Sequence, residues 1–481
     1  MARRSFFLAA PLLLAACTVG PNYHRPALAP MSGYGSAATA PESGPTLVAG
    51  ADVPAQWWQV FHSAELDDLV ALALKNNSTI EAARASLRAA NEQTRAQRGA
   101  DYPQVTGSLE PTRQKFADVL ASPLSNNREL YSLTTTQLEV TYSPDLFGGN
   151  RRNVESLQAQ ADQQRFELEA ARLTLASNVV VAAIQDALLR AQIGETRAII
   201  DAQQRTLDSF RRQLKGGQLS TADVAGQETA LAQAEATLPP LEKSFRVNRD
   251  LLAALVGRTP GEPVEVRFDL ASLTLPDQLP LSLPAQLVEH RPDVRIAEAQ
   301  LHSASAQIGV AKAARLPNIQ LAATAGSAAL ALTPAFGPEY DFWSLAATLT
   351  APIYDGGTLL HRQRAAEAAY QQAAAQYQGT VVGAFQNTAD ALHAVWTDGE
   401  AMRTAQAASA ASRRSLDIAE RQRSAGQGTA LAVLSAEAAD HQTRLTRLQA
   451  QASRDEDVAA LFQALGGGWW NAEPAALAAS R

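Results

Sequence analysis

The chain contains the same succession of segments twice, and this repetition constrains its fold more than any other feature. Each half has a helix-like stretch, two alternating segments, a Pro-x-x-x-Gly-Gly motif starting at Pro144 or Pro352, and a long Ala- and Gln-rich stretch ending at Gly217 or Gly426. The two long stretches match in length to within a single position. A helix of this length measures roughly 100 Å. The sequence therefore predicts a duplicated unit, a strand hairpin joined to a very long helical hairpin.

The alternating segments have the pattern of amphipathic membrane strands. In the first half Leu138, Val140 and Tyr142 alternate with polar residues, and in the second Ile319 and Leu321 begin a similar alternation. A half-buried sheet of a soluble protein would also alternate, but segments of about ten residues that occur twice favour a transmembrane barrel. We expect β-hairpins at about 104–142 and about 318–351.

The long stretches have an apolar residue every seventh position. The two rows consist mostly of small and medium-sized residues: Val154, Ala161, Leu168, Leu175, Ala182 and Leu189; then Ala374, Val381, Val395 and Met402, with Thr388 as a polar member. Such rows allow neighbouring helices to pack closely side by side, as in an α-barrel. We predict helical hairpins over 150–255 and 358–465. Pro239-Pro240 should break the return helix of the first hairpin.

These patterns divide the chain into consecutive parts. We predict a signal peptide, an N-terminal tether with little fixed structure, a first repeat, a linker, a second repeat and a tail, over residues 1–16, 17–55, 56–265, 266–283, 284–470 and 471–481. Each repeat begins with a helix that precedes its β-hairpin. The fold class is mainly α with transmembrane β.

The N-terminus resembles a secretion signal that ends in a lipid attachment site. Two arginines precede a short apolar run, and small residues lead to Cys17, the only cysteine of the chain. A lone cysteine is otherwise a small buried hydrophobe, but this position favours covalent lipid attachment. The next residue is Thr18, not the Asp that tends to retain lipoproteins at the inner membrane. No later stretch is apolar for about 18 residues, so any membrane-spanning role falls to the strands.

Four predicted strands per chain cannot close a barrel, and lipid does not tolerate an open sheet edge. Two chains would supply eight strands, whose lumen side chains fill, whereas three would supply twelve and leave room for a channel. Four chains are also compatible with this geometry.

Several motifs resemble the TolC-type outer-membrane efflux factors, and in particular the lipoprotein branch that contains OprM and NodT. They are Cys17 to Tyr23, Trp57-Trp58-x-x-Phe61, Arg291-Pro292-Asp293-Val294 and Ala464 to Trp469. The resemblance implies a homotrimer with a 12-stranded barrel, anchored by lipid in the cell outer membrane and continuous with a helical tunnel in the periplasm. It also implies a periplasmic adaptor (membrane fusion protein) and an inner-membrane pump of the resistance-nodulation-division type as partners.

Composition and motifs argue against a nucleic-acid-binding protein and against an enzyme. The net charge of −7 argues against nucleic-acid binding. No nucleophile elbow, phosphate-binding loop or dinucleotide fingerprint occurs, and the seven histidines have no metal-ligand spacing. We therefore expect no enzyme activity, no metal and no cofactor apart from the lipid on Cys17.

The turns that join the helices of each hairpin are candidate sites. Glycine is what a tight helix reversal needs, so turn chemistry alone accounts for them. The resemblance adds that adaptor tips dock against these turns. The candidate docking residues are Gly217, Gln218 and Ser220 in the first turn and Gly426, Gln427 and Thr429 in the second.

A periplasmic gate is the second candidate site. The resemblance places pore-facing residues, often aspartates and a leucine ring, just after the second turn. The matching positions are Leu431, Ala432 and Ser435, so the acidic residues are missing there, and Asp223 is the acidic counterpart in the first half. We expect closure by Leu431 with Val433, with Asp223 secondary. Alternatively, Leu431 and Val433 only pack the hairpin.

These observations favour a passive outer-membrane channel of a tripartite efflux system that exports small molecules. An outer channel of a type I protein secretion system shares the same pattern and is the alternative within transport. A coiled-coil scaffold lipoprotein is the alternative of a different class, but a scaffold has no need of amphipathic hairpins at matched positions. The sequence does not identify the exported substrates.

Overall fold

The computed structural model describes residues 18–26, 46–115, 117, 130–262, 264–276, 278–281, 289–330 and 338–472. They form two compact units. The first comprises the described parts of Met1–Pro26, Leu87–Gln164 and Ala297–Tyr377, and the second comprises the rest. The predicted signal peptide and Cys17 lie outside the described residues, as does nearly all of the tail.

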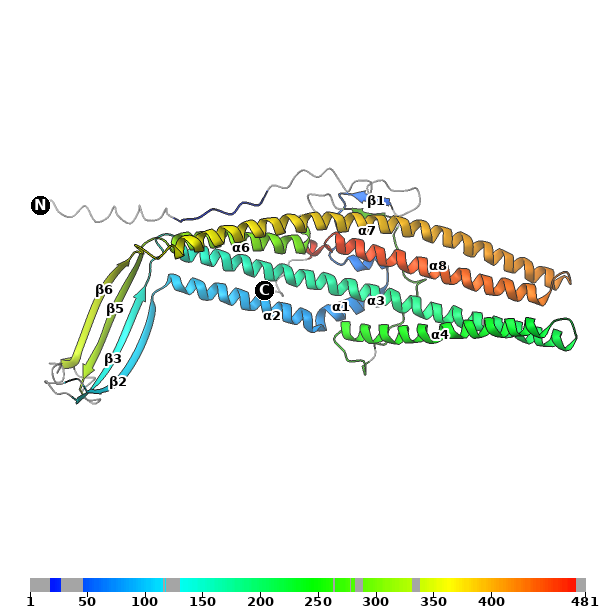
Figure 1. Ribbon diagram of the computed structural model, residues 1–481, viewed down its shortest axis with the longest axis horizontal. Coiled ribbons are helices and arrows are strands. Elements are labelled where there is room, and N and C mark those ends of the chain that lie inside the picture. Colours follow the sequence, from blue (N-terminus) through cyan, green and yellow to red (C-terminus); the bar gives the residue numbers. More distant parts are fainter. Residues whose placement is uncertain are drawn as a thin grey trace. The chain divides into compact units, whose positions relative to one another are not determined.

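The first unit contains a four-stranded antiparallel sheet (Figure 1). Its strands are β2 (Gln104–Lys115), β3 (Leu130–Tyr142), β5 (Asn318–Ala329) and β6 (Asp341–Thr350), in the spatial order β2-β3-β5-β6. Each half of the chain thus supplies one hairpin, and the two hairpins join through β3 and β5.

The register of this sheet separates large apolar side chains from polar ones. Val105 pairs with Val140, which pairs with Ala323, and Ala323 pairs with Leu345, so these residues share one face. The same face carries Leu109, Leu138, Tyr142, Ile319, Leu321, Trp343 and Leu349. The opposite face carries Glu110, Gln137, Glu139, Thr324, Ser344 and Thr348, with Tyr131, Leu133 and Phe342 as its large exceptions.

Long helices make up most of the remaining chain, as predicted. Helices α3 (Gly149–Lys215) and α7 (Thr358–Ser424) each have 67 residues, and their return helices α4 (Thr221–Leu255) and α8 (Ala430–Ala464) each have 35. All four boundaries of the second hairpin lie at one constant offset from their counterparts in the first. The equal lengths expected from the repeat are therefore confirmed.

An aspartate organises the start of each long helix. The Asp145 carboxylate accepts the backbone N–H of Arg151 at 2.9 Å, and the Asp355 carboxylate accepts those of Leu359 and Gly357 at 2.7 and 2.9 Å. These backbone donors, Leu359 first, lower the pKa of Asp355. Gly148 has a φ of +78°, a conformation that favours glycine. The glycines of the Pro-x-x-x-Gly-Gly motif thus serve the sharp change from strand to helix.

The heptad rows are the buried face of the long helices. Leu168, Ala182, Val381 and Val395 are all less than 5% exposed. Thr388 is also buried, and its hydroxyl donates to the carbonyl of Ala384 at 3.0 Å, so the one polar member of the rows has a partner. Part of α3 is apolar enough, over 18 residues, to cross a membrane, but 67% of that window is buried inside the protein. This segment has the burial of a core helix.

The prediction that Pro239-Pro240 breaks the return helix is wrong, because α4 continues through both prolines. The prolines remove two N–H donors and cost about 3 kcal/mol each in a helix interior. Packing on both sides outweighs this loss. Leu231 lies in an apolar cluster before the prolines, and Asn248 donates to the carbonyl of Ala182 at 2.8 Å after them.

The expectation of little fixed structure before residue 56 is wrong at two places. Strand β1 (Thr46–Ala49) pairs in parallel with β4 (Gln278–Leu281), which lies within the predicted linker. Residues 18–26 contact α3 and α6 (Pro292–Ala313) of the first unit, as described below. Neither segment has a helical or alternating pattern long enough to be recognised from the sequence.

The remaining elements are short or precede the hairpins. The helix predicted ahead of the first β-hairpin is divided at Asn77, whose ψ of 127° is extended. The parts are α1 (Ala64–Asn76), α2 (Ser78–Arg98) and the 3-10 turn η4 (Gly99–Asp101); three more 3-10 turns are η3 (Trp57–Phe61), η8 (Pro338–Tyr340) and η9 (Trp469–Asn471).

The aromatic motifs form a core in the second unit. Trp57 is 1% exposed and stacks on Phe462 at a centroid distance of 5.4 Å. Arg291 donates to the carbonyl of Ala464 at 2.7 Å, and Trp469 donates its indole N–H to the carbonyl of His290 at 2.8 Å. Three of the four motifs that carry the resemblance thus bring the starts of both repeats together with the end of the second repeat.

Candidate functional sites at the hairpin tips and the N-terminal segment

The first turn closes α3 with a compact set of backbone hydrogen bonds. The N–H of Gly217 bonds to the carbonyl of Leu214 and that of Gln218 to Gln213, both at 2.9 Å. Gly217 has a φ of +71°, which a side chain would strain. Ser220 then caps α4, which begins at the next residue.

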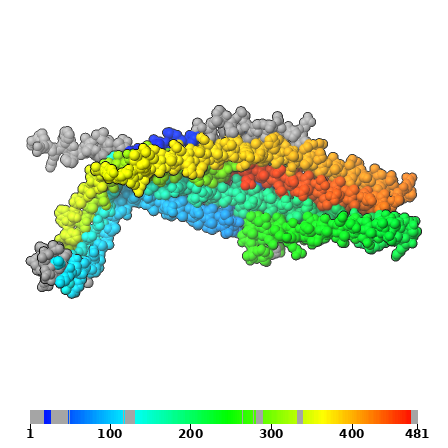
Figure 2. Space-filling model, in the orientation of Figure 1, coloured from blue at the N-terminus to red at the C-terminus, as the bar shows by residue number. Residues whose placement is uncertain are grey.

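The second turn repeats the first at equivalent positions. The N–H of Gly426 bonds to the carbonyl of Arg423 at 3.0 Å and that of Gln427 to Gln422 at 2.8 Å, with a φ of +73° at Gly426. All six candidate docking residues are exposed. Figure 2 shows the two turns, green and orange, on the surface of the second unit. Glycine is required here by the turns themselves, so only the exposed side chains are available for a partner.

Both return helices begin with a side-chain cap. The hydroxyl of Ser220 accepts the N–H of Asp223 at 3.3 Å, and that of Thr429 accepts the N–H of Ala432 at 3.1 Å. Asp223 completes a capping box, because its carboxylate accepts the Ser220 hydroxyl and N–H at 2.7 and 2.8 Å. These bonds lower the pKa of Asp223, the hydroxyl contributing most. The candidate gate acid therefore serves as a helix cap in the structure.

The apolar gate candidates occupy different environments. Leu431 is half-buried, whereas Val433 is 8% exposed and lines a cleft together with Leu416 of α7. Val433 thus packs within its own chain, which is the alternative considered for it. Val224 in the first hairpin is likewise buried in a cluster with Leu207 and Leu231. Of the two predicted apolar gate residues, Leu431 is therefore the one whose side chain is accessible enough to line an entrance.

A network of charged side chains between helices was not predicted. His441 of α8 lies 2.6 Å from Glu195 of α3, and Arg205 of α3 lies 2.5 Å from Glu437 of α8. Asp440 is 1% exposed and pairs with Arg444 at 2.6 Å.

The network borders a cleft of about 640 Å³ between α3, α7 and α8. Arg413 of α7 reaches Asp440 at 3.7 Å, so the cleft residues connect the second hairpin to α3 of the first. Glu195 and His441 are 246 positions apart, and nothing in their local sequence indicates the contact.

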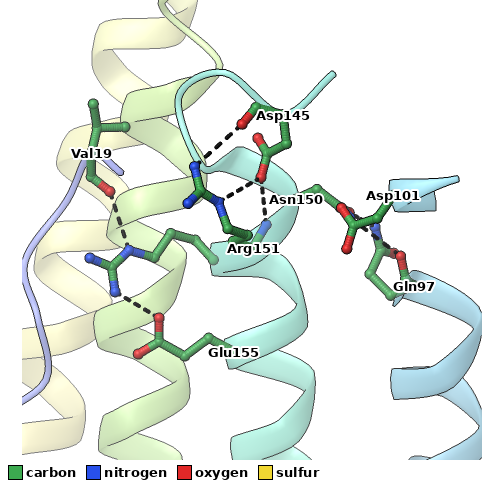
Figure 3. Close-up of polar contacts among 8 residues, drawn as sticks. Val19, Gln97, Asp101, Asp145, Asn150, Arg151 and Glu155 are labelled. Carbon is green, nitrogen blue, oxygen red and sulfur yellow. Dashed lines mark hydrogen bonds and ion pairs between the residues drawn. The ribbon is translucent and has the colours of Figure 1, made fainter. Parts of the chain in front are cut away.

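The segment that follows Cys17 lies against the start of α3. The N–H of Val19 bonds to the carbonyl of Phe147 at 3.0 Å, and Arg152 donates to the carbonyl of Val19 at 3.3 Å (Figure 3). The same guanidinium pairs with Glu155 at 2.7 Å. The residues next to Cys17 are thus held where β3 turns into α3.

Further contacts hold the same segment on α6. Tyr23 stacks on His302 with ring centroids 4.3 Å apart, and Arg25 pairs with Glu298 at 2.5 Å. Burial, followed by the charge of Glu298, raises the pKa of Tyr23, so its hydroxyl stays protonated. Sequence reasoning treated these residues only as part of a motif and a tether.

Within the described residues no group of three or more His, Cys, Asp or Glu side chains is arranged to hold a metal ion.

Comparison with known proteins shows that the chain is similar to outer membrane efflux and export proteins. The family model described as "Outer membrane efflux protein" matches residues 69–258 and 283–467. The outer membrane protein OprJ of Pseudomonas aeruginosa is 30% identical over 473 residues, covering 95% of this chain and 94% of that protein. The pyoverdine export outer membrane protein OpmQ of Pseudomonas putida is 29% identical, covering 95% and 96%.

Solved structures show the same similarity in three dimensions. The open-state MtrE outer membrane channel of Neisseria gonorrhoeae superposes with a TM-score of 0.80 and 25% identity, covering 94% of this chain and 99% of that one.

Proposed function

The chain belongs to the outer membrane efflux protein family, and we propose that it is the outer-membrane channel of a tripartite efflux system that exports small molecules. It resides in the outer membrane, like its relatives. The channel is passive and hydrolyses nothing; energy comes from an inner-membrane pump of the resistance-nodulation-division type, reached through a periplasmic adaptor.

The observation that carries this proposal is the amphipathic sheet. Its apolar face exposes Leu109 and Leu138 by 57% and 59%, and Leu345 by 77%, which suits contact with lipid. Its other face is mostly polar and suits a water-filled lumen. The sheet has two open edges, so three copies, contributing twelve strands, close it into a barrel.

The helical hairpins extend this channel into the periplasm. Their exposed turns, with Gln218 and Gln427 at the tips, are the proposed docking sites for the adaptor. Leu431, with Asp223 secondary, is proposed to line the resting entrance. The lipid is proposed on Cys17, and the binding of residues 18–26 to α3 and α6 would hold it close to the sheet.

The proposal is tested with the full chain in two assays. Purified protein should run as a trimer and conduct ions in planar bilayers. Cells lacking it should accumulate a fluorescent efflux dye and should recover export when the gene is returned. A monomeric, non-conducting protein would contradict the proposed barrel. A conducting trimer that affects secretion of a protein but not dye efflux would establish the type I alternative.

A further inference from the structure

The charged side chains of the four-stranded sheet are divided between its two faces. The polar face carries Glu110 and Glu139, both acidic. The only basic residues of the four described strands, Arg113 and Lys115, lie on the apolar face, because even numbers of residues separate them from Leu109. Both basic side chains are exposed. The face that presents leucine and valine along most of β2 and β3 thus ends in two positive charges.

Both basic residues lie at the end of the sheet that is remote from the helices. The chain enters β2 from η4 and leaves β3 toward α3 at one end, where Gln104 pairs with Thr141 (Figure 1). At the other end Lys115 pairs with Leu130. In the proposed channel the helices lie in the periplasm, so this second end faces the cell exterior. The inference that follows rests on that proposed function.

Strand length places the two charges near the outer boundary of the membrane. Arg113 and Lys115 lie eight and ten residues beyond Val105, the first apolar residue of β2. These intervals measure about 27 and 34 Å along a strand, or about 20 and 26 Å along the membrane normal at a tilt near 40°. The apolar band of such barrels is about 25 Å tall, and a basic residue at its middle is costly. The long side chains of Arg113 and Lys115 therefore reach the lipid headgroups from the edge of the band.

The surroundings of Arg113 suit an anion. Its cross-strand neighbour is Ser132, whose hydroxyl is a further hydrogen-bond donor, whereas Leu130 beside Lys115 is the apolar exception. The one acid of this face within the described strands is Asp341, at the start of β6 on the far edge of the sheet. It lies level with a position four residues before Arg113, which puts the two residues roughly 20 Å apart.

We propose that Arg113 and Lys115 bind the phosphate groups of lipopolysaccharide, the lipid of the outer leaflet of the outer membrane. The planar guanidinium of Arg113 can donate two parallel hydrogen bonds to one phosphate, and the ammonium of Lys115 adds a second positive charge. The two residues are about 7 Å apart along one face of β2, so both reach the same headgroup. Leu109 and Leu138 lie closer to the membrane centre on this face, are more than half exposed, and contact the acyl chains.

Binding of lipid A to the purified full-length protein tests the site. The probes are lipid A with both phosphates and the same lipid after enzymatic removal of the phosphates, and retained lipid is counted by native mass spectrometry. We expect the phosphorylated lipid to bind about tenfold more tightly, and this preference to disappear in R113Q/K115Q. Millimolar inorganic phosphate should not displace the lipid, because the acyl chains contribute to its binding.

Two further variants serve as controls. K312Q/R315Q removes one lysine and one arginine just before β5, at the periplasmic end of the sheet, and should bind lipid A as the unaltered chain does. R113K/K115R keeps both charges and should keep the preference for the phosphorylated lipid. All these variants should form trimers that conduct ions in planar bilayers.

The possible outcomes separate the proposal from its alternatives. Equal binding of the two lipids by the unaltered trimer, or an unchanged preference in R113Q/K115Q, would overturn the proposal. Complete displacement by inorganic phosphate would also overturn it, because the site would then bind a phosphate ion and not the lipid. If the unaltered chain is a monomer that does not conduct, the proposed function itself is contradicted.

Discussion

At the scale of single residues, contacts separate the roles of the gate candidates. The carboxylate of Asp223 accepts hydrogen bonds from Ser220, and Val433 is buried among helices. Leu431 remains partly exposed near the tip. A narrow apolar ring resists ions by partial dewetting and needs no salt bridge.

We therefore expect Leu431→Ser to raise single-channel conductance in planar bilayers severalfold, because three copies would lose their apolar constriction. Asp223→Asn should change mainly the cation preference, since the asparagine carbonyl oxygen can still accept the backbone N–H of Ser220 in the capping box. Leu251→Ser, at an exposed position of α4 away from the tip, is the control. If Asp223→Asn opens the channel and Leu431→Ser does not, the hypothesis of an apolar gate is wrong, and Asp223 closes the entrance instead.

Buried carboxyl groups make stability depend on pH. Asp455 is fully buried beside Arg454, and burial raises its pKa to about 6 from 3.8, with Arg454 opposing. The protonated side chain therefore adds to the free energy of unfolding. This contribution is complete below pH 3.8 and is lost as the pH rises through about 6.

Asp455→Asn should therefore stabilise the protein at pH 7.5, by up to about 3 kcal/mol, and have no effect near pH 4. Thermal melting of the two proteins followed by circular dichroism across this pH range measures the difference. A stability gap that does not change with pH would show that Asp455 does not titrate in this range.

At the scale of elements, the main feature is the equal length of the two long helices. Helices α3 and α7 both have 67 residues, although their sequences differ. Local deviations, such as the prolines within α4, are tolerated because packing along the hairpin outweighs two missing hydrogen bonds.

Deleting one heptad from α3, residues 168–174, should abolish export, because the first tip would move by about 10 Å relative to the second while the apolar row stays in phase. Removing seven residues from each of the four long helices should be milder, since the tips stay level. Dye efflux and the amount of trimer in the membrane are the measurements. Equal loss in both variants would mean that tip alignment is not the reason for the matched lengths.

At the scale of the whole molecule, the open sheet makes one copy incomplete. Both edges of the described sheet lack a partner, so in the proposed barrel the membrane part depends on other copies for its backbone hydrogen bonds. A lipid anchor adds to membrane binding but cannot supply those bonds.

Cys17→Ala in a chain with a cleavable signal should still give membrane-inserted trimers, because the barrel holds the protein independently of the lipid. Fractionation and native electrophoresis against the unaltered chain are the measurements. Soluble periplasmic protein would contradict a self-sufficient barrel.

Sequence alone determined the duplicated plan, the long helices with their buried heptad rows, and the alternating segments that became strands. These features depend on periodicity and on glycine turns, which are local and therefore visible along the chain. The helix caps that Ser220 and Thr429 form are local in the same way, because each depends on a hydroxyl side chain next to a turn.

Only the tertiary structure decided which segments meet. The parallel pairing of β1 with β4, the binding of residues 18–26 to α3 and α6, and the contact of His441 with Glu195 join parts far apart in sequence. It also decided that α4 stays continuous through its prolines. In each case the free energy comes from neighbours that no local pattern specifies, so the outcome depends on packing and not on propensity.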